Sequence, residues 1–216
     1  MGIKDENTRR IRKLEEEFSD ERIAEFFQID DAQPAAALGR RKRKAALCAV
    51  LAFGIAVLCV AVALRFYTPW IMPDATMGSA IEKMDCVIVA KHAYGPAGPG
   101  LGDIILYGSS IPDGGGGTRE LIGRVIGLPG DEVEIQAWGV YRNGGLLDEP
   151  YLEAEGGAGA AWMRATVPEG SCFVLADSRT SGIDSRDGRV GFVAEADIHG
   201  KAVFRLLPVS RAGVPR

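Results

Sequence analysis

A chain of 216 residues is long enough for one ordinary domain plus appendages. Its charge is close to balance, with 25 Lys and Arg against 29 Asp and Glu, so the composition does not indicate a nucleic-acid-binding protein. The charged residues are distributed unevenly along the chain. Residues 1–44 hold 11 basic and 10 acidic residues and end in five consecutive basic ones, Arg40 to Lys44.

Residues 1–44 are predicted to form a charged tail. Two interpretations of its first 38 residues are open, namely an amphipathic helix that docks on a partner or a membrane surface, and a solvated tail. The helical interpretation rests on loosely periodic apolar residues, Ile11, Leu14, Phe18, Ile23 and Phe26. The segment from Gln33 to Gly39, with a proline and an alanine run, is interpreted as a short linker.

The next 20 residues, Ala45 to Leu64, contain no charge and no proline. At about 1.5 Å per residue they would span roughly 30 Å, the thickness of a bilayer's hydrocarbon core. We therefore predict a transmembrane helix over residues 45–66, with Phe66, Tyr67 and Trp70 as an interfacial aromatic belt. The long charged segment ahead disfavours a cleavable signal peptide. The basic cluster predicts a single-pass protein of the cell membrane, with a cytoplasmic N-terminus and residues 67–216 outside.

The part after residue 66 is predicted to be mostly β. Short β-rich runs alternate with glycine-containing breaks, and no amphipathic helix of 10–15 residues is present. Gly114 to Gly117 are expected at a hairpin tip, Asn143 and Gly144 in a tight turn, and residues 153–161 in a surface loop. The strand candidates begin at Cys86, Asp103, Leu121, Glu132 and Cys172.

The four cysteines do not have the spacing of a metal site, so we expect neither a metal nor a cofactor. Cys48 and Cys59 fall within the apolar run. Cys86 and Cys172 fall in the external part, where an oxidising compartment permits a disulfide. A bridge between these two and a pair of buried free thiols are both open interpretations.

Three segments carry a family resemblance: P-D-A-T-M-G-S-A-I from Pro73, R-V-I-G-L-P-G-D-E-V-E-I from Arg124, and A-D-S-R-T-S-G-I-D-S-R from Ala176. In order and spacing they resemble the conserved boxes of type I signal peptidases, which are serine proteases with a Ser–Lys dyad. The resemblance covers roughly Pro73 to Pro208. It implies coiled antiparallel sheets of the signal peptidase type, and exported precursor polypeptides as the molecules recognised.

The residues that carry the chemistry in that family are altered. The nucleophile position holds Thr76, whose β-branch restricts its rotamers. The base position holds Gly123, which cannot accept a proton, and loss of one dyad member typically costs several orders of magnitude in rate. Asp74 stands at an oxyanion-donor position, where a carboxylate opposes developing negative charge. Gly182 replaces a serine that orients the lysine, and Ala176 replaces a glycine.

A further set of positions in the family is retained and is expected to build the substrate groove and its scaffold. Because charge-assisted links are strong, we predict that Arg124 pairs with Asp177 and that Asp184 pairs with Arg186. The retained set is Met77, Arg124, Asp177, Arg179, Asp184, Ser185 and Arg186.

The altered catalytic positions and the retained scaffold positions together favour a membrane protein that recognises exported precursors, for example pilins. Such a protein would cleave them poorly or not at all. One alternative is an active signal peptidase that uses Thr76 with another base, and the only histidines, His92 and His199, do not stand at the base position. Another is a structural adaptor for an active signal peptidase. The expected partners are an exported polypeptide, the lipid bilayer and an active signal peptidase or sortase, without nucleic acid.

Overall fold

The computed structural model describes residues 12, 13, 16, 34–152 and 162–215 of the chain. Two compact units are present, residues 1–58 and residues 59–216. The surface loop predicted over residues 153–161 lies outside the described residues, and so does nearly all of the segment before residue 34. The alternatives for that segment stay open.

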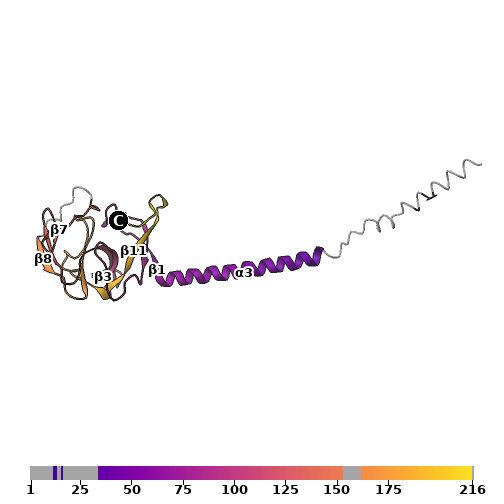
Figure 1. The fold of residues 1–216 in the computed structure, drawn as a ribbon, viewed down its shortest axis with the longest axis horizontal. Helices are drawn as coiled ribbons and strands as arrows, with labels where there is room; N and C mark the ends of the chain where they lie inside the picture. Colours follow the sequence, from indigo (N-terminus) through magenta and orange to yellow (C-terminus); the bar gives the residue numbers. More distant parts are fainter. Residues whose placement is uncertain (1–11, 14–15, 17–33, 153–161, 216) are drawn as a thin grey trace, which may run out of the picture. The chain divides into compact units, whose positions relative to one another are not determined.

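A single long helix, α3, runs from Pro34 to Phe66 (Figure 1). The linker predicted for Gln33 to Gly39 is therefore wrong from Pro34 onward, because a proline is well tolerated in the first turn of a helix. Within α3, the 24 residues from Arg43 to Phe66 have a mean hydropathy of 2.9 and are long and apolar enough to cross a bilayer. Large apolar side chains such as Leu51, Phe53 and Leu58 are exposed along it.

The second unit is built from antiparallel strands, which confirms the predicted mostly β fold. A seven-stranded sheet has the order β1-β2-β11-β3-β4-β9-β10, and a four-stranded sheet has the order β7-β6-β5-β8. The five runs predicted as strands correspond to β2, β3, β4, β5 and β9. The elements are β1 (Tyr67–Ile71), β2 (Cys86–Ala90), β3 (Ile104–Pro112), β4 (Thr118–Gly127), β5 (Glu132–Gln136), β6 (Gly139–Arg142), β7 (Gly145–Leu146), β8 (Met163–Thr166), β9 (Ser171–Leu175), β10 (Val193–Ala194), the 3-10 helix η1 (Glu195–Asp197), β11 (Ile198–Leu207) and the 3-10 helix η2 (Val209–Arg211).

Strand β4 lies between β3 and β9 and is buried from Leu121 to Gly127. Its alternate residues face different apolar clusters, since successive side chains of a strand point to opposite faces. Leu121 and Val125 pack in one cluster with Val174 of β9, whereas Ile122 packs in another with Met77. β4 is thus the element from which a side chain can be presented to either side of the large sheet.

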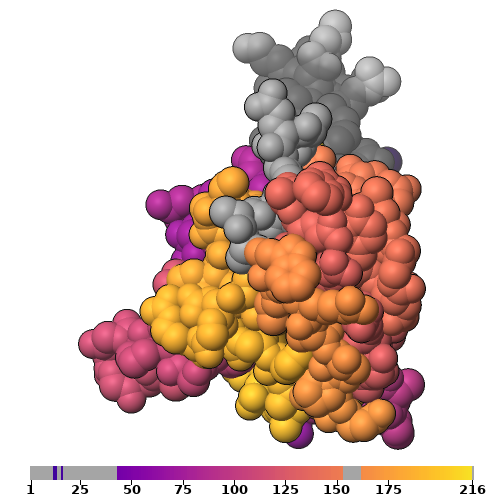
Figure 2. All heavy atoms as spheres, turned by 90° about the vertical axis from the view of Figure 1, so that its left-hand side faces the viewer, coloured from indigo at the N-terminus to yellow at the C-terminus, as the bar shows by residue number. Residues whose placement is uncertain are grey.

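Two predicted turns are confirmed. Asn143 and Gly144 join β6 to β7 with φ values of 53° and 81°, as a two-residue hairpin turn of type I′ requires. The four-glycine segment lies between β3 and β4, where the Asp113 carboxylate accepts hydrogen bonds from the amides of Gly115 and Gly117. In the space-filling view this part of the chain is the pink lobe that projects at the lower left (Figure 2).

Candidate active site

The segment of the first box forms a closed loop between β1 and β2. Its ends are joined by hydrogen bonds from the Met72 amide to the Asp85 carbonyl and from the Met84 amide to the Met72 carbonyl, each 2.9 Å. Met77 forms an isolated bridge with Ile81 and is fully buried in the core. Met77 therefore anchors the loop, as a scaffold residue does.

Thr76 lies in this loop and contacts the segment that follows β9. Its backbone carbonyl accepts a hydrogen bond from the Ser178 amide at 2.8 Å. Its hydroxyl donates to Oδ1 of Asp74 at 2.7 Å, and the same oxygen accepts the Thr76 amide at 3.2 Å. The nucleophile position and the oxyanion-donor position thus form one hydrogen-bonded pair.

The Asp74 carboxylate is also paired with a cation on β4. Nη2 of Arg119 lies 3.2 Å from Oδ2 of Asp74, and both side chains are partly exposed. Sequence reasoning missed Arg119, although Arg119, Leu121 and Gly123 alternate along β4 and so share a face. An arginine that neutralises Asp74 weakens the repulsion expected at this position between the carboxylate and a developing oxyanion.

A pocket of about 230 Å³ opens beside the Thr76 hydroxyl. Among the described residues of its lining, Asp74 and Arg119 are the charged ones, and none of these described residues is a lysine or a histidine. The pocket brings the nucleophile loop together with β4 and with the two residues that flank Gly182. The lining residues are Asp74, Ala75, Thr76, Arg119, Leu121, Ser181 and Ile183.

Gly123, at the base position, lies directly opposite Ile105 of β3. A Cβ atom built on Gly123 would lie 2.5 Å from Cγ1 of Val174 and 3.1 Å from the carbonyl oxygen of Leu175. Both distances are shorter than ordinary van der Waals contacts. β9 therefore occupies the space through which a side chain at position 123 would leave the backbone.

Gly182 is packed against Ala176, and sequence reasoning missed this contact. A Cβ atom built on Gly182 would lie 2.1 Å from Cβ of Ala176 and 3.0 Å from the carbonyl oxygen of Ser178. The resemblance described above has a glycine at position 176 and a serine at position 182. In this chain position 176 carries a side chain and position 182 carries none, the reverse of the family pattern. The methyl group of Ala176 therefore occupies the space that a serine at position 182 would need for its hydroxyl.

The predicted pair of Arg124 and Asp177 is confirmed. Nε and Nη2 of Arg124 donate to the two carboxylate oxygens of Asp177 at 2.9 and 2.6 Å, and both side chains are buried. The guanidinium also lies 3.9 Å from the ring centroid of Tyr151 and donates to the Gly102 carbonyl. Burial raises the pKa of the Asp177 carboxyl, against the opposing effect of Arg124.

The predicted pair of Asp184 and Arg186 is also confirmed. Two guanidinium nitrogens of Arg186 donate to the Asp184 carboxylate at 2.8 and 2.7 Å, and this carboxylate also accepts the Ala176 amide at 3.0 Å. The Ser185 hydroxyl accepts the Val174 amide at 3.0 Å. These contacts fix the segment after β9 against that strand, and so hold Ala176 in place.

The two histidines do not line the pocket. His92 lies beside Arg65, with 3.4 Å between Nε2 and Nη1, and packs edge-on against Phe66. Nδ1 of His199 lies 2.8 Å from a carboxylate oxygen of Glu120. Neither is placed to act on Thr76.

Cys86 and Cys172 are both free thiols in the structure, and Cys86 is only partly buried, which differs from the expected pair of buried thiols. Cys172 is buried, and burial together with the nearby charge of Glu195 raises its pKa to about 12.

The β-rich fold and the order of its motifs define a class of protein, the signal peptidase scaffold. Residues 44–207 match the family model described as signal peptidase, peptidase S26, and the chain belongs to this family.

Its relatives include the probable signal peptidase I-1 of Synechocystis sp., 35% identical over 163 residues that make up 72% of this chain and 80% of the relative. Signal peptidase I U of Bacillus subtilis is 32% identical over 169 residues, which are 74% of this chain and 87% of that protein. A crystal structure of a signal peptidase I from Enterococcus faecalis V583 is 31% identical, with a TM-score of 0.39, and the match covers 48% of this chain and 95% of that one.

Proposed function

We propose that this protein recognises exported precursor polypeptides and binds them without cleaving them efficiently. The observation that carries the proposal is the contact of Gly123 with β9. The base is missing, and its exit path is filled by Val174 and the Leu175 carbonyl. A hydroxyl without the lysine base of this family is a poor nucleophile, whereas main-chain recognition of an extended peptide needs no nucleophile.

The test uses the full-length protein in detergent and a fluorescent precursor peptide with a small-x-small cleavage motif. We expect saturable binding by fluorescence anisotropy and no product by mass spectrometry over hours. The matched control is Thr76→Ala, which should bind the peptide as the parent does. Turnover that Thr76→Ala abolishes would overturn the proposal, and so would failure of both proteins to bind.

A second candidate function is slow peptide hydrolysis by Thr76 with Asp74 as its base. The 2.7 Å contact between the hydroxyl and the carboxylate favours it, because this is the distance at which a base accepts a proton. If this function is present, Asp74→Asn should abolish the cleavage while the hydrogen bond from the Thr76 amide can persist. Cleavage that survives Asp74→Asn would exclude Asp74 as the base.

We also propose the cellular arrangement. Residues 1–44 would lie in the cytoplasm, residues 45–66 would cross the membrane, and residues 67–216 would form the extracytoplasmic domain. The length and hydropathy of Arg43–Phe66 and the basic residues before it support this topology. Protease added to intact cells should digest the external domain and spare a tag at the N-terminus, and the reverse pattern would refute the topology.

The client and partners follow by analogy only. A pilin or another surface-protein precursor would be the client, and an active signal peptidase or a sortase would supply the chemistry that this chain lacks. Covalent crosslinking in cells through a photoreactive residue at position 181, in the lining of the pocket beside Thr76, should capture the client. The same residue placed at Arg189, which is outside that lining, is the control.

A further inference from the structure

Two cations without a carboxylate partner meet at the end of α3. Among the described residues from 45 onward, every lysine and arginine pairs with a carboxylate except Arg65, Lys83 and Lys91. Arg65 belongs to the last turn of α3 and Lys91 contacts that turn, whereas Lys83 lies in the loop between β1 and β2. Two of these three unpaired charges thus gather in one place.

The register of β1 against β2 places Lys91 beside the end of the helix. Tyr67 pairs with Ala90, so Lys91 follows at the level of Phe66, and its amide donates to the Phe66 carbonyl at 2.8 Å. Nζ of Lys91 donates to the Leu64 carbonyl at 3.1 Å. Both the backbone and the side chain of Lys91 are therefore fixed to the last turn of α3.

Arg65 adds a second charge beside Lys91. Its Nη1 lies 3.4 Å from Nε2 of His92, whose ring packs edge-on against Phe66. A neutral histidine orients the guanidinium but, unlike a carboxylate, cancels none of its charge. The three side chains are exposed and belong to the second compact unit. We call Arg65, Lys91 and His92 the basic site.

The helix dipole accounts for only part of this charge. The carbonyl end of a helix carries roughly half a negative charge, whereas Arg65 and Lys91 bring two full positive charges. The segments around them, residues 45–73 and 86–102, contain neither aspartate nor glutamate. Lys201, which lies opposite Ala90 on β11, is already paired with Asp103 at 2.6 Å. An anion from outside the chain would therefore complete the basic site.

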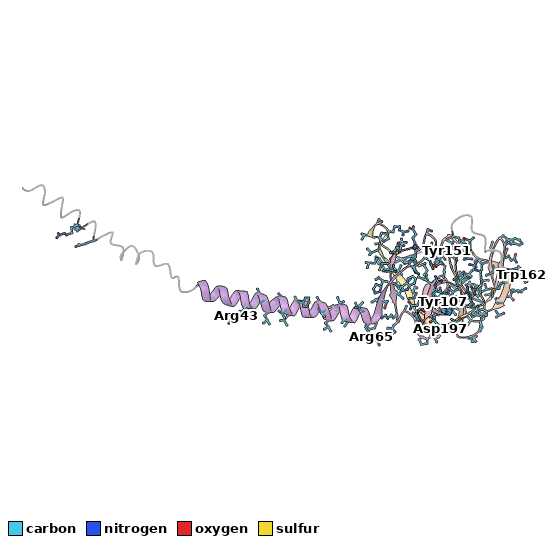
Figure 3. The ribbon with its side chains drawn as sticks, turned by 180° about the vertical axis from the view of Figure 1, so that it is seen from behind. Arg43, Arg65, Tyr107, Tyr151, Trp162 and Asp197 are labelled. Atoms are coloured by element: carbon cyan, nitrogen blue, oxygen red, sulfur yellow. The ribbon has the colours of Figure 1, made fainter. Side chains whose placement is uncertain are left out.

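The basic site lies where a membrane-spanning helix would leave the hydrocarbon core. Arg65 is the first charged residue after the run from Ala45 to Leu64, at the end of α3 that leads into β1 (Figure 3). This run covers roughly the thickness of the hydrocarbon core, so Arg65 falls at the depth of the headgroup phosphates. Tyr67 is 47% exposed, and tyrosine is enriched at this depth. The anion available there is a lipid phosphate.

We propose that the basic site binds the phosphate group of an anionic phospholipid. The guanidinium of Arg65 donates to two phosphate oxygens, and Lys91 donates with the ammonium protons that do not bond the Leu64 carbonyl. His92 holds the guanidinium in place. Phosphatidylglycerol fits better than phosphatidylcholine, whose choline brings a further positive charge to the site.

This inference rests on the proposed crossing of the membrane by residues 45–66, in either direction. It is independent of the proposed role in binding precursors, because the basic site shares no described residue with the pocket beside Thr76.

The test uses the full-length protein with benzoylphenylalanine in place of Tyr67, in nanodiscs of equal parts phosphatidylglycerol and phosphatidylcholine. Light joins position 67 to a neighbouring lipid, which mass spectrometry identifies. We expect phosphatidylglycerol adducts to exceed phosphatidylcholine adducts by about fivefold or more, the effect of one Lys or Arg near an anionic surface. The basic run from Arg40 to Lys44 cannot cause this excess, because it stands roughly 30 Å away at the other end of the uncharged helix.

Substitution of both cations, Arg65→Gln with Lys91→Gln, should bring the ratio of the two adducts close to one. The matched control is Lys83→Gln, which removes an exposed and equally unpaired charge at the other end of the β1–β2 pair and should leave the ratio unchanged. Inorganic phosphate distinguishes lipid from free anion. At equal ionic strength it should lower the ratio no more than chloride does, because the acyl chains also hold the lipid.

Three results would overturn the proposal: equal capture of the two lipids, a ratio that the double substitution leaves unchanged, or a ratio that phosphate lowers more than chloride does. The last result would assign the site to free phosphate. Capture of neither lipid would refute the membrane crossing together with this inference, whereas equal capture would leave the crossing intact. If the double variant does not fold, Arg65→Gln alone decides by the same ratio.

Discussion

Restoring the family residues at the altered positions should restore peptide cleavage only when Ala176 is also returned to glycine. The perturbation is a set of five substitutions: Thr76→Ser, Gly123→Lys, Asp74→Ser, Gly182→Ser and Ala176→Gly. The comparison is the fourfold variant that keeps Ala176. We expect cleavage after a small-x-small motif from the fivefold variant, and activity from the fourfold variant at least about tenfold lower, equivalent to about 1.4 kcal/mol in the barrier.

The magnitude follows from the contacts at the two glycines. The Cβ of a residue at position 182 would lie 2.1 Å from Cβ of Ala176, so either the strand or the loop must move. Overpacking of this kind typically costs about 1–3 kcal/mol and displaces the introduced hydroxyl. At position 123 rotation of the Val174 side chain can move its Cγ1 atom, which lies at 2.5 Å, but the Leu175 carbonyl oxygen at 3.1 Å also requires a small shift of the β9 backbone.

The substitution at position 74 should have the largest effect on rate within the restored set. A hydroxyl donor to the oxyanion is worth about 3–4 kcal/mol, or roughly a few hundred-fold. Asp74→Ser also leaves Arg119 without its carboxylate, but that side chain is 40% exposed and the loss is small. Returning serine to aspartate in the fivefold variant should therefore abolish most of the gain.

The assay is cleavage of a quenched fluorescent precursor peptide, with the product identified by mass spectrometry and binding measured in parallel. The control replaces the serine at position 76 of the fivefold variant by alanine. A fivefold variant that folds, binds the peptide and shows no cleavage would refute the reasoning, because positions 76 and 123 would then not face each other. Equal activity of the fourfold variant would refute the role assigned to Ala176.

The remaining predictions concern stability and reactivity. Arg124→Leu should lower the free energy of unfolding by about 3–5 kcal/mol, measured with urea, because it leaves a buried carboxylate without its cation. Arg189→Leu, which breaks an exposed pair, should lower it far less. Cys172 should resist iodoacetamide at pH 8.5 until the protein is unfolded, since its pKa is raised to about 12. For the same reason the stabilisation that the buried neutral thiol of Cys172 gives to the fold is fully present below the pKa of the unfolded thiol, near 8.5. This stabilisation is lost as the pH rises through about 12. Gly144→Ala, at a φ of 81°, should lower the thermal midpoint, whereas Gly145→Ala should not.

The fold could be predicted where the sequence carries a local signal. Alternating and β-branched runs marked β2 to β5 and β9, and motif spacing predicted the buried pair of Arg124 and Asp177. The short edge strand β8 has no such signal, and its position depends on pairing with β5. β1 was assigned to an interfacial belt because Tyr67 and Trp70 follow the apolar run, and only its pairing with β2 makes it a strand.

The positions of the candidate site follow from the resemblance, and the contacts among them could not be predicted. Thr76, Asp74, Gly123 and Gly182 were all identified as altered, yet three contacts depend on how distant segments meet in space. The Thr76 hydroxyl is bonded to Asp74, that carboxylate is paired with Arg119, and Gly182 touches Ala176. The order of residues in a motif does not show which side chains contact each other in the fold. The register of β4 against β9 decides these contacts.

Both glycines that replace catalytic side chains contact the same segment of β9 and the residue after it. Gly123 meets Val174 and the Leu175 carbonyl, and Gly182 meets Ala176. The same segment keeps its supporting contacts, since Asp184 still accepts the Ala176 amide and Ser185 the Val174 amide. Decay of an unused site would be expected to loosen such supports. Here the space beside both glycines is filled while the strand stays anchored, an arrangement that supports the proposed binding role.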